Sequence, residues 1–259
     1  NQMGIVLPHE HLLVDTRKDA HPQARELGLR TRFDEQVRAE NRGHVVYHPF
    51  HYRDNLVLSD VAIATEELME FKFAGGNAVV DLTTAQMGRD SDGLRRISIA
   101  AGVHVIMGCG RFAHNFWTED ETKLPIERLT ADIVQEFECG LPGSAAKPGI
   151  IGEIGISDIR NPTEVKNLRA SARAQGKIGC AMNVHVPIWE KEGHAILDIV
   201  EEEGADPTRV VLSHLDETIS DVDYHDSLAK RGAYVEYDQF GMHIMGYEGL
   251  FLPGDTERI

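Results

Sequence analysis

Two histidines, His9 and His11, lie in a short apolar segment near the start of the chain, with Glu10 between them. If this segment is a β-strand, alternate side chains share a face, so both imidazoles point one way and Glu10 points the other. Two imidazoles about 6–7 Å apart along a strand can converge on one cation. An ordinary pair of polar residues gives the same pattern, so the motif indicates a metal site only together with further ligands.

A single carboxylate, Glu153, interrupts the apolar run from Ile150 to Ile156. A carboxylate in such a strand has to be paired, protonated or bound to a metal, because burying an unpaired charge is very unfavourable. A salt bridge to a buried arginine or lysine is the alternative, but the neighbouring predicted strands contain neither residue. The sequence therefore favours a metal-ligating role for Glu153.

Two further histidines, His185 and His214, lie near the carboxyl ends of apolar runs. Positions 153, 185 and 214 are 32 and 29 residues apart, and each interval is the length of one strand-plus-helix unit. Side chains separated by one such unit come from neighbouring parallel strands, and the carboxyl ends of those strands form the active-site end of barrel enzymes. Each histidine alone is compatible with a satisfied polar residue, whereas the whole set predicts a common site.

Nitrogen and oxygen donors without thiolates suit Zn²⁺, or a similar divalent ion such as Mn²⁺ or Co²⁺. Five ligands are too many for one catalytic zinc ion that keeps an open position, and they fit two ions bridged by a carboxylate and a hydroxide. Two ions about 3.5–4 Å apart would lower the pKa of bound water from about 15.7 towards 7. The predicted chemistry is hydrolysis of an ester, lactone, amide or phosphoester, with Glu153, His185 and His214 as catalytic residues.

Seven short apolar, β-branched runs predict strands, and most of them are followed by residues with helical spacing. The predicted strands are Ile5–Leu7 continuing into His9–Val14, Ala78–Thr83, Val103–Gly108, Ile150–Ile156, Ala181–Val186, Val210–Leu215 and Ala233–Tyr237. The predicted helices span about 59–75, 90–102, 125–140, 163–176, 193–204 and 221–232.

This alternation predicts an α/β fold with a parallel sheet, as an open doubly wound sheet or a closed (β/α)8 barrel. The only trace of a dinucleotide fingerprint is Gly108-Cys109-Gly110, which favours the barrel. A barrel has eight strands, so we expect the eighth to lie beyond this sequence, in a unit that begins near Thr256. We interpret residues 1–259 as one barrel domain, with residues 17–58 as a long irregular loop after the first strand.

The chain of 259 residues carries 26 Lys and Arg against 42 Asp and Glu, a net charge of −16. Such a surface repels nucleic acid and anionic lipid, so neither is an expected partner. No apolar run is long enough to span a bilayer, and no secretory signal opens the sequence. Three cysteines without close spacing, Cys109, Cys139 and Cys180, indicate reduced thiols in a cytoplasmic protein.

The motifs resemble the phosphotriesterase-like branch of the metal-dependent amidohydrolase superfamily, and most of all its phosphotriesterase-related, or resiniferatoxin-binding, group. The resemblance extends from Gly4 to about Asp255. It is carried by Leu7-Pro8-His9-Glu10-His11-Leu12, Gly149-Ile150-Ile151-Gly152-Glu153-Ile154-Gly155, Ser213-His214-Leu215-Asp216 and Glu236-Tyr237-Asp238-Gln239-Phe240-Gly241.

The resemblance implies a (β/α)8 barrel with a binuclear metal centre. His9 and His11 would hold the buried ion, His185 and His214 the more exposed ion, and Glu153 would bridge them where some relatives use a carboxylated lysine. Dimers are common in this branch, so a homodimer is an expectation.

The family also has an aspartate at the end of strand eight that binds the buried ion and accepts a proton. No residue of this sequence fills that place, since Asp255 follows the seventh predicted strand and Asp238 belongs to it.

Several other residues are candidates for contact with a small-molecule substrate. Arg111 and Phe112 follow the third predicted strand, where Arg111 could pair with an anionic group. Tyr237 and Asp238 lie at the rim, where one of them would orient a ligand or contact substrate. Asp216 would accept a hydrogen bond from a ligand imidazole or from substrate, or cap a helix. The loop residues with lid potential are His48, His51, Tyr52 and Arg53.

The leading hypothesis is a metal-dependent hydrolase acting on an ester, lactone or amide, with phosphotriester cleavage as a narrower activity of the branch. A non-catalytic small-molecule-binding protein on the same barrel is the alternative, motivated by the absent strand-eight aspartate. A third hypothesis, a nucleotide enzyme with an open sheet, predicts no metal and a phosphate at a helix N-terminus.

Overall fold

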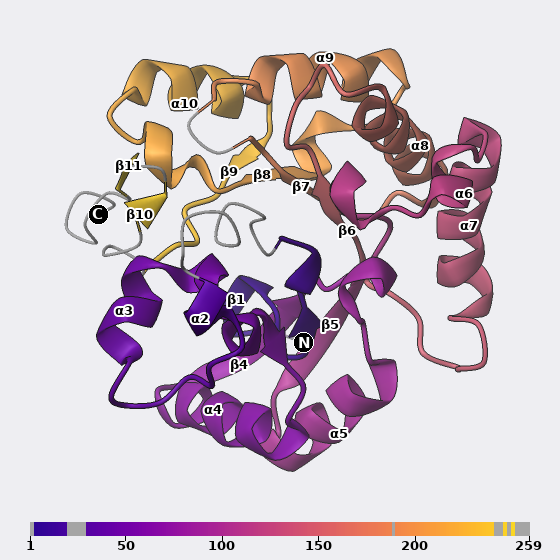
Figure 1. The fold of residues 1–259 in the computed structure, drawn as a ribbon. Helices are drawn as coiled ribbons and strands as arrows, with labels where there is room; N and C mark the ends of the chain where they lie inside the picture. Colours follow the sequence, from indigo (N-terminus) through magenta and orange to yellow (C-terminus); the bar gives the residue numbers. More distant parts are fainter. Residues whose placement is uncertain (1–2, 20–29, 188–189, 241–245, 248–249, 252–259) are drawn as a thin grey trace.

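A curled sheet of seven parallel strands forms the centre of the protein in the computed structural model (Figure 1). The structure describes residues 3–19, 30–187, 190–240, 246–247 and 250–251. The strands follow one another in the sheet in the order of the chain, β1-β4-β5-β6-β7-β8-β9, and every neighbouring pair is parallel. Their bounds are β1 Ile5–Glu10, β4 Gly76–Asp81, β5 His104–Cys109, β6 Ile150–Gly155, β7 Met182–His185, β8 Val210–Ser213 and β9 Tyr234–Val235.

Helices connect these strands and cover the outside of the sheet (Figure 1). Asp60, Asp90, Asn161 and Asp221 begin four of them, because their side chains accept hydrogen bonds from first-turn backbone N–H groups. The main helices are α4 Val61–Phe73, α5 Ser91–Ala101, α7 Ile126–Cys139, α8 Pro162–Ile178, α9 Gly193–Glu202 and α10 Val222–Lys230. They agree with the predicted helices to within a few residues.

Shorter elements lie in the connections. They are the helix α6 Glu119–Thr122, the 3₁₀ helices η4 Ala85–Met87, η5 His114–Phe116, η6 Pro207–Arg209 and η7 Leu215–Thr218, and the antiparallel pair β10 Gly246–Tyr247 and β11 Leu250–Phe251. No described helix is both long and apolar enough to cross a membrane. The three cysteines are free thiols.

The sheet curls until its first and last strands approach each other. His9 of β1 lies 3.0 Å from a carboxylate oxygen of Asp238, which follows β9. This curvature is that of the predicted (β/α)8 barrel, and it does not agree with an open doubly wound sheet. The described residues supply seven strands to this sheet. Asp255 and residues 256–259, where the next unit is predicted, lie outside the described part of the chain.

The largest apolar cluster packs β6, β7 and β8 against the helices that cover them. Ile151 and Ile154 of β6, Val184 of β7 and Leu212 of β8 are fully buried, as is Leu168 of α8. Side chains that are fully buried in a close-packed core have little freedom to shift. The carboxyl ends of these three strands are therefore held in a fixed relation.

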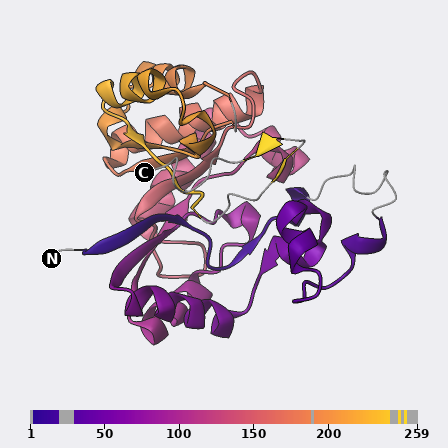
Figure 2. The same ribbon diagram turned by 90° about the vertical axis from the view of Figure 1, so that its left-hand side faces the viewer.

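The described part of residues 17–58 contains more secondary structure than the irregular loop expected from the sequence. An antiparallel pair, β2 Val14–Asp15 with β3 Val57–Leu58, joins the two ends of this segment. Figure 2 shows the described helices of this segment beyond the carboxyl end of β1. Between its ends are η1 Arg17–Asp19, α2 Arg30–Phe33, α3 Arg42–Tyr47, η2 Pro49–His51 and η3 Arg53–Leu56, while residues 20–29 lie outside the described part.

Two glycines allow β5, β6 and β7 to approach closely beside Glu153. A Cβ at Gly108 of β5 would lie only 2.1 Å from the Gly152 carbonyl oxygen of β6. Gly152 itself has a φ of +139°, and a Cβ there would lie 2.8 Å from the Asn183 carbonyl oxygen. Neither position accepts a side chain without displacing a neighbouring strand.

We expect Gly108→Ala to lower the free energy of unfolding by about 1–3 kcal/mol or more, because the methyl group overlaps backbone that cannot yield. Gly43→Ala in α3 is the matched control, since nothing lies within 4 Å of a Cβ at that position. That control should raise stability by about 0.4–1 kcal/mol. Chemical denaturation measures both, and a Gly108→Ala protein as stable as the wild type would contradict the close approach.

Candidate metal centre

Glu153 lies at the centre of a cluster of four histidines. Its side chain is 2% exposed, and its two carboxylate oxygens face different pairs of imidazoles. One oxygen, Oε1, lies 2.6 Å from His185 Nδ1 and 3.0 Å from His214 Nε2. The other, Oε2, lies 3.5 Å from the Nε2 atoms of both His9 and His11. The five side chains grouped by the sequence analysis therefore lie together, with Glu153 between two pairs.

The carboxyl ends of four strands deliver these side chains. His9 is in β1 and His11 follows that strand, while His185 is the last residue of β7 and His214 comes directly after β8. His214 has a φ of +60°, a left-handed conformation that is uncommon for residues other than glycine and that clusters at functional sites. The rings of His185 and His214 are 4.4 Å apart, measured between centroids.

The electrostatics of the cluster follow from burial opposed by charge pairing. Burial would raise the pKa of Glu153, but the charges of His9 and His185 outweigh it and hold that pKa well below its usual range. Burial likewise opposes protonation of His9 and His214, but the carboxylates around them prevail. The pKa of His9 is raised well above its usual value, and that of His214 to about 9. Burial lowers the pKa of His185, and the charge of His214 adds to this effect.

The donor set suits divalent metal ions. Two groups of ligand atoms share Glu153, one with His9 and His11 and the other with His185 and His214. Donors around a tetrahedral zinc ion at bond lengths near 2.1 Å lie about 3.4 Å apart. The two 3.5 Å separations from Glu153 Oε2 match this value, whereas the separations of 2.6 and 3.0 Å from Oε1 are shorter and are hydrogen-bond distances. Imidazole nitrogens and carboxylate oxygens are also ligands that Zn²⁺, Mn²⁺ and Co²⁺ accept.

Polar residues that the sequence analysis did not select hold the histidines from outside. Thr83 Oγ1 lies 2.9 Å from His11 Nδ1. The buried Asp81 accepts hydrogen bonds from the backbone N–H groups of Leu12, at 2.8 Å, and Thr83, at 3.1 Å. The signal that could have found Asp81 is its place at the end of an apolar run, the same signal that selected Glu153.

A second buried carboxylate, Glu236, lies on the other side of the cluster. It accepts a hydrogen bond of 3.0 Å from Asn183 Nδ2, and Asn183 in turn accepts one of 2.7 Å from Ser213. Glu236 Oε2 is 3.6 Å from His9 Nδ1. This chain of hydrogen bonds links β7 and β8 to the residues that follow β9.

The predicted substrate contacts divide into two groups. Phe112 is buried, with its ring 5.2 Å from that of His185, so it forms a wall of the cluster. Asp238 also lies there, beside His9 and His214. Arg111 is instead paired with two acidic side chains, Asp132 at 3.1 Å and Glu121 at 3.6 Å.

Two more predicted contacts have hydrogen-bond partners other than Glu153. The Tyr237 hydroxyl lies 2.6 Å from His225 Nδ1 in α10. Asp216 is fully buried and accepts a hydrogen bond of 3.1 Å from the backbone N–H of Asp238. It therefore supports the backbone of a neighbour of the cluster.

The four predicted lid residues form contacts within segment 17–58. Tyr52 is fully buried, with its hydroxyl 2.9 Å from His44 Nδ1. The rings of His48 and His51 are stacked with centroids 4.9 Å apart. Arg53 lies 3.2 Å from Asp34.

The whole chain, residues 1–259, matches the phosphotriesterase family. This chain belongs to the phosphotriesterase family. An N-acetyltaurine hydrolase from Xenopus tropicalis is 36% identical over 262 residues, which cover all of this chain and 74% of the relative. A phosphotriesterase-related protein from Nematostella vectensis is 34% identical over 263 residues, which cover all of this chain and 75% of the relative.

A solved structure gives the same result for the fold. The crystal structure of a resiniferatoxin-binding protein from Rhodobacter sphaeroides has a TM-score of 0.92 and 36% identity, covering 99% of this chain and 72% of that one. The resemblance inferred from the motifs is therefore confirmed. Hydrolysis is the activity that membership of the phosphotriesterase family supports.

This phosphotriesterase family member has a second perturbed carboxyl group three residues after His214. Both carboxyl oxygens of Glu217 are buried, and burial raises the pKa of that side chain from 4.5 to about 7. The charge of His214 opposes the shift without cancelling it. The raised pKa means that the folded protein binds a proton that the unfolded chain releases at lower pH.

We expect the stability contributed by protonated Glu217 to be complete below about pH 4.5 and to be lost as the pH rises through about 7. Glu217→Gln should therefore flatten the dependence of unfolding free energy on pH between these values. Glu119→Gln, at a side chain that is 86% exposed, is the control and should leave the profile unchanged. Denaturant titrations at a series of pH values test this, and an unaltered slope in Glu217→Gln would contradict it.

Proposed function

We propose that this protein is a metal-dependent hydrolase with a binuclear centre. His9 and His11 would hold one divalent ion with Glu153 Oε2, and His185 and His214 would hold the second with Glu153 Oε1. The observation that carries the proposal is that the two oxygens of one buried carboxylate each face their own pair of imidazoles. A structural salt bridge would need one cationic partner for Glu153, whereas a bridging ligand needs this two-sided arrangement.

Two divalent ions, when bound, supply a hydroxide nucleophile at neutral pH and polarise the bond under attack. The protein's own part is to hold the donors in place in a largely buried, fixed setting. Phe112 covers one side of His185, and the buried Glu153 carries the negative charge that makes the cluster attractive to cations. Zn²⁺ is the ion we favour, with Mn²⁺ or Co²⁺ as substitutes, because imidazole and carboxylate donors suit all three.

The substrate we propose is a small molecule with a carboxylic amide, ester or lactone bond. N-acetyltaurine hydrolases from several vertebrates, including one from Mus musculus at 34% identity, match the whole of this chain. Their name describes cleavage of an N-acyl amide, which supports the acyl branch of the family's chemistry over phosphotriester cleavage. N-acetyltaurine is accordingly the first substrate to test. The homodimer stays an expectation from the family resemblance, and the cytoplasmic location stays a prediction from the cysteines.

A non-catalytic binding protein is the second candidate. The resiniferatoxin-binding protein, at 36% identity, supports it by its name. Such a protein would keep the barrel and bind a small molecule without turnover. The two candidates differ in turnover, because only the hydrolase would convert substrate to product, and it would need the ions to do so.

We expect chelation to abolish hydrolysis of N-acetyltaurine or of a substrate from a lactone and ester panel, and added Zn²⁺, Mn²⁺ or Co²⁺ to restore it.

His185→Ala should lower kcat/KM by at least about 100-fold, since even residues that only support metal ligands contribute about 10–100-fold. His104→Ala, at an exposed histidine where β5 begins, is the control and should retain activity. Turnover that survives chelation would contradict the mechanism, and metal binding without any turnover would favour the binding protein.

A further inference from the structure

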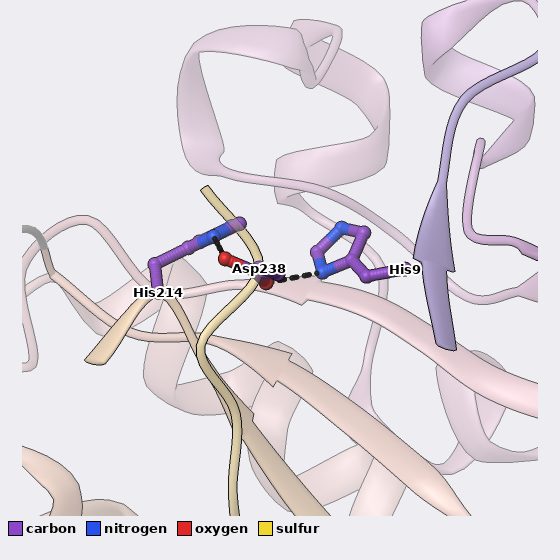
Figure 3. Close-up of side chains that lie close together, drawn as sticks. All are labelled: His9, His214 and Asp238. Carbon is purple, nitrogen blue, oxygen red and sulfur yellow. Dashed lines mark hydrogen bonds and ion pairs between the residues drawn. The ribbon is translucent and has the colours of Figure 1, made fainter. Parts of the chain in front are cut away.

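One carboxylate, Asp238, contacts a histidine from each half of the proposed centre (Figure 3). Its Oδ1 accepts a hydrogen bond of 2.9 Å from His214 Nδ1, and its Oδ2 lies 3.0 Å from His9 Nδ1. The side chain of Asp238 is only 7% exposed. The contact with His9 is an ion pair, because neither His9 Nδ1 nor Asp238 Oδ2 makes a hydrogen bond to any described residue and both atoms are buried. Each oxygen of Asp238 thus faces one imidazole and is shielded from water, an arrangement that suits orientation of those rings better than proton transfer to a substrate.

The nitrogens that contact Asp238 are the ones that do not face Glu153. His9 and His214 both turn Nε2 toward Glu153 and Nδ1 toward Asp238. A neutral imidazole carries its proton on one nitrogen, and a carboxylate at Nδ1 retains the proton there. The lone pair is then on Nε2, directed at the place where an ion would lie. Carboxylates that contact ligand histidines in this way fix both the tautomer and the ring orientation.

The other two histidines have different outer neighbours. His11 Nδ1 lies 2.9 Å from Thr83 Oγ1, a neutral group that touches one half of the centre only. His185 packs against the ring of Phe112. Asp238 is therefore distinguished from Thr83 by its charge and by serving both halves.

Asp238 is itself held firmly. Its backbone N–H donates a hydrogen bond of 3.1 Å to Asp216 Oδ2, and Asp216 is fully buried. The buried Asp216 thereby connects the segment after β8 to the residue that orients the histidines of β1 and β8.

We propose that Asp238 is a positioning residue that sets the tautomer and orientation of His9 and His214 together, and so couples the two halves of the centre. The inference rests on the proposed function, because it assigns each of these histidines to a different ion. It accounts for a buried carboxylate after β9 that lies between His9 of β1 and His214, which follows β8.

The test is zinc binding by metal-stripped protein, followed by competition with a chromophoric chelator. Asp238→Ala should weaken both ions, each by about 10–100-fold, which is the usual effect of removing a partner of a ligand histidine. Asp238→Asn should weaken one ion more than the other, because its amide has one acceptor oxygen and its NH₂ group cannot accept the second Nδ1 proton. Thr83→Val is the matched control and should weaken one ion only.

Nitrogen-15 spectra of the imidazoles in the zinc-loaded protein provide a readout that a merely structural role would not move. In the wild type, His9 and His214 should both carry the proton on Nδ1 with the downfield proton shift of a bond to a carboxylate, and in Asp238→Asn one of the two should keep the proton but lose that shift. Wild-type protein that binds no zinc would overturn the proposed function. Wild-type protein that binds two ions, with an Asp238→Ala variant that binds both as tightly or loses only one, would overturn the role of Asp238 alone.

Discussion

The centre depends on a carboxylate placed in the middle of an apolar strand. Glu153 is almost fully removed from water, and burying its charge without partners would cost more than a typical fold can supply. Four imidazoles from three other strands offset that cost. These imidazoles can meet Glu153 only if β1, β7 and β8 end on the same side of the sheet as β6. The architecture of the sheet therefore determines the chemistry of the site.

Close packing beneath Glu153 meets this requirement. The glycines at 108 and 152 let β5, β6 and β7 approach without side chains between them, and fully buried aliphatic residues fill the space toward the helices. The left-handed backbone of His214 is a local strain that the surrounding contacts have to maintain. Stability and site geometry are therefore properties of the same packing.

The sequence predicted the strands, the helices and the grouping of the five central side chains well, because each rests on a local signal. Apolar runs marked the strands, and a charged or imidazole residue at the end of a run marked the site.

The contacts of Asp238 and Glu236 with His9 were beyond such reasoning, because they exist only once the sheet has curled and brought β1 close to the residues after β9. The ion pairs of Arg111 were also beyond such reasoning, since its acidic partners come from the following helices. A substrate contact of Arg111 stays a prediction. The secondary structure in the described part of residues 17–58 also depends on contacts that local patterns do not encode, such as the pairing of β2 with β3.

The most direct test of the central claim is the number of ions bound by metal-stripped protein, measured by titration with zinc for the wild type and for Glu153→Ala. If one carboxylate bridges the two halves, the wild type binds two ions per chain and the variant loses high-affinity binding of both together. A variant that keeps either ion at wild-type affinity, or a wild type that binds fewer than two, would contradict the account.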